Sequence, residues 1–502
     1  MTLPCAFALH LAFPRVGAAW LAPFALGGLF WLWMTLAPRA AAAAGYAGGL
    51  IYFALNFNWF GETAGALLGP FGFILDLAPA AIEALAFAVA AAIASLAAQR
   101  LRGPWIPIVA AAGFTVTELL RSSGVLGVPL YQIGAAFAET PLAALAAFGG
   151  IYGLTFAVAL LGAALGAAFA EPDRRRAVVQ TACFALATGA GAAAAWAAWP
   201  ARHPEPHALR VAAVQGNITQ SVKWEAASLP RAVARYTALT RGLRSFKPQF
   251  VLWPETVITT DLLVDPVLAA IPQNAELAAS GARLRRRFGA LARSLGAVIA
   301  VGTDEATATA NYDDLLFFSG DRDDPQVYRK RRLVPFAEFL PGPEWLRGLP
   351  FANLISRFAS GSDGPPVGEQ LRVGPLICWE AVFTELAQRQ AGNGARFLAV
   401  ATDDAWFGAS DGPYAQAQIA QLRAIETGRW VVRAAATGIS GIIAPDGRWQ
   451  SRSELETQGV VTGTIGEPQP TVYSRLGPWP IGIALAALAA TAFALAAGRA
   501  RT

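Results

Sequence analysis

The sequence predicts a bundle of membrane-spanning helices joined to an extracytoplasmic α/β domain. The chain of 502 residues is 55% hydrophobic and only 15% charged, and its mean hydropathy is +0.42, which is unusual for a soluble protein. Charges are almost absent from residues 1–199 and reach globular density from about residue 208. We therefore expect a helical bundle over 1–199, a linker over 200–207, an α/β domain over 208–470 and a last membrane helix over 477–498.

Eight apolar runs are candidate spans, because a helix needs about 20 apolar residues to cross the hydrocarbon core. They are Leu3–Phe13, Gly17–Leu36, Ala42–Phe60, Ala78–Ala98, Trp105–Leu120, Pro141–Ala170, Val178–Trp199 and Pro480–Ala497. The first is short and is either a span or a re-entrant segment. It lacks the basic start of a cleaved signal peptide. Residues 1–199 are thus assigned about seven spans.

The arginines of the short loops predict the orientation of the bundle. When eight spans are drawn, one side receives nearly all of them: Arg39, Arg100, Arg102, Arg174, Arg175, Arg176, Arg499 and Arg501. The opposite loops hold only Arg15 and Arg121. The positive-inside rule places the arginine-rich side in the cytoplasm, so the α/β domain lies outside.

Polar side chains at the ends of the spans have two interpretations. Glu118 and Arg121 lie one helical turn apart. They either cap helices at the membrane interface, or pair with each other and shape a cavity for a lipid headgroup, because charge inside a span is costly and often functional.

Short β-branched runs alternate with helical patterns in the α/β domain, which is typical of helices covering a sheet. The expected strands are Leu209–Val214, Phe250–Trp253, Ala297–Val301, Leu315–Ser319, Leu371–Ile377, Phe397–Ala401, Trp430–Ala434, Ile442–Ala444 and Val460–Ile465. The expected helices are Ala226–Leu243, Gly281–Leu295, Val382–Ala391 and Pro413–Thr427.

Composition excludes several classes of function. The net charge of +5 is small and no basic face alternates with aromatic residues, so we expect no nucleic-acid partner. The α/β domain holds a single cysteine, Cys378, and therefore has no disulfide framework. All three histidines precede residue 208. This argues against Ser-His-Asp and Cys-His catalysis and against the usual zinc ligand sets, and we expect neither a metal nor a cofactor.

Without histidine, a nucleophilic Cys378 needs a carboxylate as its base. Glu255 follows one predicted strand in Trp253-Pro254-Glu255, and Cys378 follows another. Lys330 and Glu338 flank an extended run. A thiolate, a proton-accepting carboxylate and an oxyanion-stabilising lysine suit acyl transfer at an amide or ester. Each of these residues alone also has an ordinary structural interpretation. Cys378 could be a core residue, Lys330 a solvated charge and Glu255 an acid at a helix N-terminus.

Six segments together resemble the apolipoprotein N-acyltransferase family over essentially the whole chain. They are VQGNITQSVKW, WPET, YRKRRLVPFAEFLP, ICWE, DDAWFG and RAIETGRWVVRAAATGIS. The resemblance implies a nitrilase-like αββα sandwich for the α/β domain. It also implies a general base at Glu255, a lysine that stabilises the tetrahedral intermediate at Lys330, and a nucleophile at Cys378. Supporting or substrate-binding positions are implied at Glu338, Glu380, Trp224, Trp379 and Trp406.

The implied reaction has two half-reactions. Cys378 takes an acyl chain from a phospholipid as a thioester, and the α-amine of the N-terminal diacylglyceryl-cysteine of an apolipoprotein then accepts it. The protein would be a multi-pass protein of the bacterial inner membrane with its catalytic domain in the periplasm. Two other functions stay open: a membrane-tethered amidase or nitrilase that hydrolyses a small amide, and a catalytically inactive lipid-binding scaffold.

The chain departs from the family pattern at four positions. Ala337 stands in PFAE where the family has glycine, and Trp379 stands where tyrosine is commoner. Asp403 occupies a position that is often asparagine, and Gln416 one that is usually histidine. These changes bear on substrate contacts. The apolar segment Leu340–Phe358 is either a buried connection or a lid that dips into the outer leaflet.

Overall fold

The computed structural model describes residues 1–61, 77–198, 208–223, 225, 228–322, 324–348, 355–408 and 410–499. The predicted linker 200–207 and Trp224 lie outside these ranges. The contacts divide the chain into two units. Unit 1 comprises residues 1–200, 407–426 and 471–502, and unit 2 comprises residues 201–406 and 427–470. Residues 407–426, which we expected within the α/β domain, thus cluster with the helices of unit 1.

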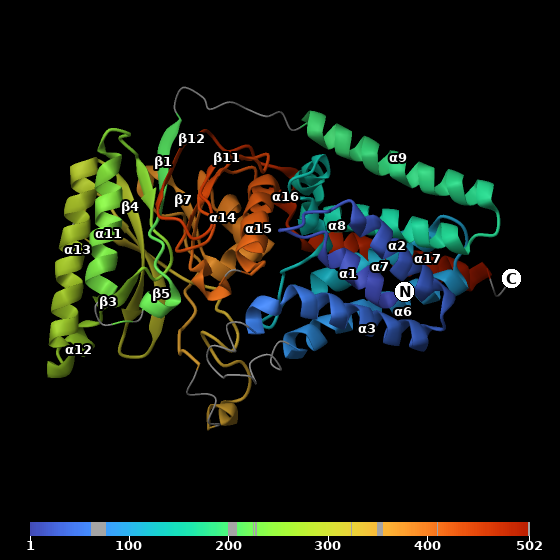
Figure 1. Cartoon of the computed structure of the whole chain (residues 1–502), viewed down its shortest axis with the longest axis horizontal. Coiled ribbons are helices and arrows are strands. Elements are labelled where there is room, and N and C mark those ends of the chain that lie inside the picture. The colour runs from blue at the N-terminus through green and yellow to red at the C-terminus, as the bar shows by residue number, and fades with distance from the viewer. Residues whose placement is uncertain are drawn as a thin grey trace. The chain divides into compact units, whose positions relative to one another are not determined.

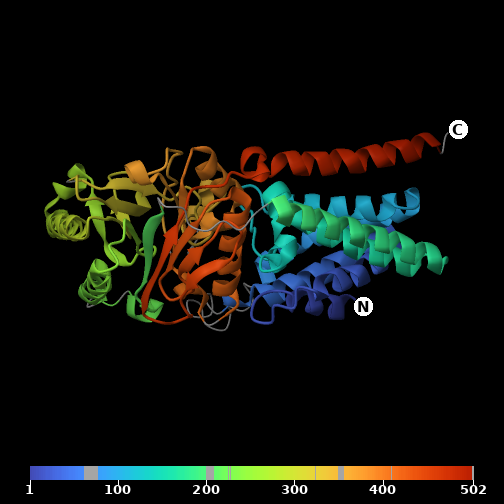
Figure 2. The ribbon, with the colours of Figure 1, turned by 90° about the horizontal axis from the view of Figure 1, so that it is seen from above.

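Unit 1 is helical, and all eight predicted spans coincide with helices. These are α1 (Thr2–His10), α2 (Leu21–Thr35), α3 (Pro38–Asn56), α6 (Leu77–Arg100), α7 (Trp105–Arg121), α8 (Ala146–Ala170, preceded by the 3₁₀ turn Pro141–Leu145), α9 (Arg174–Ala198) and α17 (Trp479–Arg499). They run roughly along one direction (Figures 1 and 2). The unit also contains most of α15 (Gly412–Thr427) and the short α16 (Val472–Leu476). Within the described ranges, four helical segments are long and apolar enough to cross a membrane: Leu77–Arg100, Pro141–Ala170, Arg174–Ala198 and Trp479–Ala497. The number of crossings stays a prediction.

Small residues bring the helices of unit 1 close together. A Cβ at Gly45 of α3 would lie 2.5 Å from the carbonyl oxygen of Phe87 in α6, and one at Gly49 would lie 2.9 Å from the Phe87 side chain. Glycine therefore allows the two backbones to approach, as is common between membrane helices.

A buried arginine ties three parts of unit 1 together. Arg121 at the end of α7 donates to Glu118 and to Glu83 of α6, each at 2.9 Å, and to the carbonyl oxygen of Val128 at 2.8 Å. All three charged side chains are at most 4% exposed. Of the two interpretations of Glu118 and Arg121, the structure shows the pairing, while a cavity for a lipid headgroup stays a hypothesis. Glu83 is a partner that the sequence pattern did not indicate.

Unit 2 contains two sheets. The described part of the first has the order β12–β1–β2–β4–β5–β6, with β3 paired to β4. The second has the order β11–β10–β9–β8–β7. The strands are β1 (Leu209–Gln215), β2 (Phe250–Leu252), β3 (Ile258–Val264), β4 (Val298–Ala306), β5 (Asn311–Phe318), β6 (Gln326–Arg329), β7 (Val373–Ile377), β8 (Phe397–Thr402), β9 (Val431–Ala435), β10 (Gly441–Ile443), β11 (Trp449–Arg452) and β12 (Gly459–Ile465).

The two sheets pack face to face between layers of helices. Apolar side chains of both sheets, among them Phe250, Phe317 and Phe397, form the core between them. The opposite face of the first sheet is covered by α11 (Ser228–Arg241) and α13 (Ala275–Leu295) (Figure 1). On the second sheet α14 (Thr384–Gly392) packs against β7 and β8. This is the αββα sandwich that the sequence predicted.

All nine predicted strands and the four predicted helices exist, with ends that differ by a few residues. Three strands, β3, β6 and β11, were not predicted. Two of them are polar edge strands, β6 and β11, whose side chains lack a continuous buried face. The fifth strand begins at Asn311 and not at Leu315, because it includes two buried carboxyl groups, Asp313 and Asp314.

Candidate active site

The directions of the strands bring the predicted catalytic residues to strand ends. In the first sheet β2 runs parallel to β4, β5 runs antiparallel to β4, and β6 runs antiparallel to β5. The ends of β2 and β6 therefore meet at one edge, where Glu255 and Lys330 follow them. In the second sheet β7 and β8 are parallel, and Cys378 and Asp403 follow their ends. Carboxyl ends of parallel strands are where α/β proteins bind ligands.

Lys330 is the centre of a buried charge cluster. Its ammonium donates to Glu255 at 2.7 Å, to Glu338 at 2.6 Å and to Asp313 at 3.0 Å. The lysine side chain is 0% exposed, whereas the Glu338 side chain keeps 19% of its surface. Glu338, a supporting position in the family resemblance, thus contacts Lys330, and the alternative of a solvated Lys330 is excluded.

Three carboxyl groups share one cation, and their pKa values diverge. Burial and the neighbouring Glu255 and Glu338 raise the pKa of Asp313 well above its usual range, despite the attraction of Lys330. Burial also raises the pKa of Glu338. Burial acts on Glu255 in the same direction, but the pKa of Glu255 is lowered, because its interactions with Lys330, Asp313 and Lys223 together outweigh that cost. The pKa of Lys330 is raised well above its usual value because its three partners outweigh burial. The directions of these shifts favour the neutral form of Asp313 and the ionised form of Glu255.

Glu255, Asp313 and Glu338 are also the described residues that could hold a metal ion, with ligand atoms within 4.8 Å of one another. The Lys330 ammonium donates to all three groups. It thus supplies the positive charge that a metal would bring.

Cys378 has a backbone conformation that side chains rarely adopt. Its φ is +45°, in the left-handed region that costs about 1 kcal/mol or more for a residue with a Cβ. Such strain is common where a nucleophile must project from a tight turn. Burial, followed by the negative charge of Glu255, raises the pKa of the thiol well above its usual value. The resting sulfur therefore carries its proton and needs a base.

Glu380 connects the turn of the nucleophile to the strand that carries the lysine. Its carboxylate accepts from the backbone N–H groups of Ile377 and Arg331, both at 2.7 Å, and from the Tyr328 hydroxyl at 2.9 Å. Ile377 precedes Cys378 and Arg331 follows Lys330. The fully buried Glu380 therefore fixes the turn at Cys378 relative to the segment that carries Lys330.

The predicted tryptophans differ in their surroundings. Trp379 is buried, and its ring packs edge-on against Phe383 with centroids 5.9 Å apart. Trp406 is 44% exposed and Trp345, in the predicted lid, is 69% exposed. The exposed Trp345 argues against an ordinary buried connection. Residues 349–354 of the predicted lid lie outside the described part of the chain.

Sequence reasoning missed two participants, Asp313 and Lys223. Asp313 lies in a strand otherwise rich in apolar residues, and consecutive buried carboxyl groups in such a strand are a signal that could have been used. Lys223, in α10 (Gln220–Lys223), binds Asp403 at 2.5 Å. Asp403 was noticed only as a departure from the family pattern.

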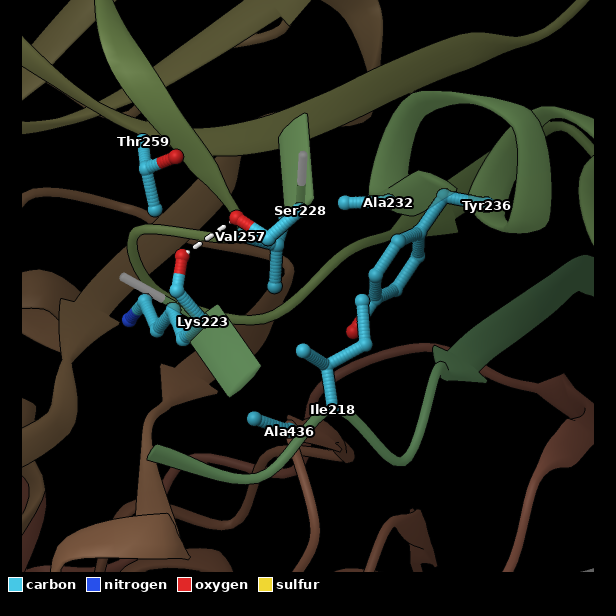
Figure 3. Close-up of a pocket in the computed structure, with 8 residues that line it drawn as sticks. All are labelled: Ile218, Lys223, Ser228, Ala232, Tyr236, Val257, Thr259 and Ala436. Atoms are coloured by element: carbon cyan, nitrogen blue, oxygen red, sulfur yellow. Dashed lines mark hydrogen bonds between the residues drawn. The ribbon is translucent and has the colours of Figure 1, made fainter. Parts of the chain in front are cut away.

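A small cavity lies beside Lys223 and is lined by Ile218, Lys223, Ser228, Ala232, Tyr236, Val257, Thr259 and Ala436 (Figure 3). In this view the Lys223 ammonium points away from the Tyr236 ring, and its partner is Asp403. The cavity encloses about 10 Å³, which is room for one water molecule. It is therefore too small for a substrate.

Comparison with known proteins decides the family. The carbon-nitrogen hydrolase model matches residues 210–469, and the apolipoprotein N-acyltransferase N-terminal domain model matches residues 5–164. The chain is 34% identical to the apolipoprotein N-acyltransferase of Azotobacter vinelandii over 472 residues, which cover 91% of this chain and 88% of the relative. The chain belongs to the apolipoprotein N-acyltransferase family.

A second relative, the apolipoprotein N-acyltransferase of Pseudomonas syringae, is 31% identical over 89% of this chain and 87% of its own length. Among solved structures, a CN-hydrolase superfamily protein from Xanthomonas campestris is 22% identical, with a TM-score of 0.37 over 52% of this chain and 91% of its own.

Proposed function

We propose that the chain transfers an acyl chain from a phospholipid, through a thioester on Cys378, to the N-terminal diacylglyceryl-cysteine of apolipoproteins. The observation that carries this proposal is the buried Lys330, bound to the Glu255 base and to Glu338, in the unit that also carries a protonated and strained Cys378. Family membership supports the lipoprotein as acceptor. The phospholipid as donor and the roles of the single residues are our inference.

In the first half-reaction Glu255 takes the proton of the Cys378 thiol as the sulfur attacks the ester carbonyl carbon of the donor. The C–S bond forms and the carbonyl oxygen becomes an oxyanion, which Lys330 stabilises. All three ammonium protons of Lys330 are engaged at rest. Asp313, the most distant partner at 3.0 Å, is the one that releases its hydrogen bond most easily. The ester C–O bond then breaks, and Glu255 returns the proton to the departing lysophospholipid.

In the second half-reaction the α-amine of the acceptor cysteine attacks the thioester carbonyl. Glu255 accepts a proton from the amine, the C–S bond breaks and the sulfur recovers a proton. The products are an amide and the free thiol, so atoms and charges balance over the cycle.

We place the catalytic unit in the periplasm and the helices of unit 1 in the bacterial inner membrane. The four long apolar helices support a membrane protein, and the loop arginines support this orientation. A bundle of this size favours lipid-anchored substrates over a small soluble amide, for which one anchor would suffice. The intact hydrogen bonds around Lys330 argue against an inactive scaffold.

The proposal is tested by mass spectrometry of the peptide that contains Cys378 after the protein is mixed with phospholipid vesicles. We expect a mass increase of one acyl chain, which disappears when a diacylglyceryl-cysteine peptide is added. Cys183→Ala, which removes an exposed thiol, should leave the adduct unchanged, and Cys378→Ala should abolish it. An unmodified Cys378 in a preparation that acylates the peptide would overturn the proposal.

A further inference from the structure

A second buried ion pair adjoins the catalytic base from the side opposite to Lys330. The Lys223 ammonium donates to Asp403 Oδ2 at 2.5 Å, and the Gln220 side-chain amide donates to the same oxygen at 2.8 Å. The Lys223 and Asp403 side chains are 8% and 2% exposed. A buried pair of this kind is costly to assemble and rarely adds net stability. Net stability therefore does not explain why the pair lies beside Glu255.

Asp403 touches the base through its backbone. Its N–H donates to Glu255 Oε2 at 2.8 Å, while Lys330 donates to Oε1 at 2.7 Å. The Asp403 carboxylate in turn accepts from Lys223, Gln220 and, at 3.3 Å, the N–H of Ala405. These bonds hold the turn after β8 in the conformation that aims the Asp403 N–H at Glu255. Each carboxylate oxygen of the base is thereby fixed from one side.

We propose that Lys223 and Asp403 are positioning residues for Glu255: they orient it and balance the charge around it. The inference rests on the proposed role of Glu255 as the base for Cys378. Lys223 offsets the negative charge of Asp403, so the base meets an almost neutral pair. Removal of one partner would expose Glu255 to the field of the other.

The charged groups that face Glu255 come from several elements. They are Lys330 after β6, Asp313 of β5, Asp304 of β4, Glu338 and Cys378 after their strands, Lys223 of α10 and Asp403 after β8. Of these, Lys223 lowers the pKa of Glu255. Two substitutions in the pair should therefore act in opposite directions, which loss of folding alone cannot produce.

Asp403→Asn keeps the size of the side chain and leaves the Lys223 charge uncompensated, so Glu255 should ionise at lower pH. Lys223→Met leaves Asp403 uncompensated, so Glu255 should ionise at higher pH. We expect each shift to be on the order of one pH unit. The double variant removes both charges and should return close to the unsubstituted protein.

The readout is the pH profile of Cys378 alkylation by iodoacetamide in the intact protein, followed on the Cys378 peptide. This reaction needs the thiol and its base but no lipid, so a failure of the proposed acyl donor leaves the test valid. The acid limb should move down for Asp403→Asn and up for Lys223→Met. Glu305→Gln is the control. It removes one negative charge from the face of β4 opposite to Asp304, and the acid limb of its profile should stay at the original pH.

The inference would be overturned if the acid limbs of the two single variants moved in the same direction. It would also be overturned if neither limb moved while the Cys378 thiol stayed reactive. If Lys223→Met does not fold, Asp403→Asn decides alone, because an acid limb at the original pH then excludes the proposed charge balance.

Discussion

In each unit the described residues include a buried cation that binds more than one carboxyl group, and the two clusters differ in how many carboxyl groups share the cation. In unit 1, Arg121 binds Glu83 and Glu118 and gives its remaining donors to carbonyl oxygens. In unit 2, Lys330 has only three donors and meets three carboxyl groups. The planar fork of arginine suits a fixed structural junction. The lysine cluster has two more carboxyl groups than cations, against one more in the arginine cluster. It therefore favours a bound proton more strongly, and a bound proton is what acid–base catalysis uses. The following predictions test this contrast, beginning with the largest effect.

Lys330→Met should abolish acyl transfer, with a loss of at least about 10³-fold in kcat/KM, because the oxyanion loses its cation. The variant also leaves three buried carboxyl groups without a counter-charge and should lose roughly 3–5 kcal/mol of stability. The measurements are acyl transfer to a lipopeptide and thermal unfolding in detergent. Lys330→Met combined with Glu338→Gln, which removes one carboxylate partner of the lysine, should regain part of the stability but not the activity. Recovery of activity in this double variant would assign Lys330 a purely structural role.

Arg121→Met should lower the stability of the protein but leave acyl transfer nearly unchanged, unlike Lys330→Met. It leaves Glu83 and Glu118 buried without a partner, so we expect a stability loss of roughly 3–5 kcal/mol. Activity per folded molecule should fall by less than about threefold, because Arg121 belongs to no reacting group. Arg121→Lys, which keeps the charge but not the fork, should lose less stability. A variant that folds as well as the original but transfers no acyl chain would show that the arginine cluster takes part in catalysis.

The sequence alone predicted most of the fold, because charge segregation and strand–helix alternation are local patterns. It also indicated Glu255 and Cys378, since each follows a predicted strand and histidine is absent from the domain, and it indicated Lys330 as a cation beside an extended run in a family motif. Asp313 was not predicted, because its contact with Lys330 depends on the register of β5 with β6. The Lys223–Asp403 pair escaped because its partners are 180 residues apart. Pairings across elements depend on tertiary packing, which a single sequence does not display.

Glu380→Gln tests a buried carboxylate of unit 2 that has a positioning role. We expect Glu380 to hold Cys378 and Lys330 in place without contacting the substrate. The amide replaces one acceptor oxygen with a donor that faces an N–H or O–H group, so one hydrogen bond is lost and one buried donor is left unpaired. This costs about 1–3 kcal/mol, and we expect kcat to fall roughly 10- to 100-fold with little change in KM. Tyr328→Phe removes only the 2.9 Å hydroxyl contact and should cost less. A rise in KM at constant kcat would instead make Glu380 a substrate contact.

Asp313→Asn should have the smallest effect near neutral pH, because the raised pKa of Asp313 favours the neutral carboxyl group, which asparagine resembles in size and charge. We expect activity within about threefold of the original at pH 7. The stability profile should differ more. The raised pKa of Asp313 means that the folded state keeps a proton that the unfolded chain releases near its ordinary pKa of about 4.

The stability of the original protein therefore falls as pH rises above that value, by about 1.4 kcal/mol per pH unit for this one proton, until the raised pKa is passed. In Asp313→Asn that contribution to the slope is absent. Thermal unfolding from pH 5 to pH 8 measures it, with Cys183→Ala, at an exposed position, as a reference in which the slope should be unchanged. The slope of stability against pH could instead be identical for the original protein and Asp313→Asn. That result would mean that Asp313 is ionised beside Lys330, and that the lysine cluster is a fixed structural junction like the cluster around Arg121.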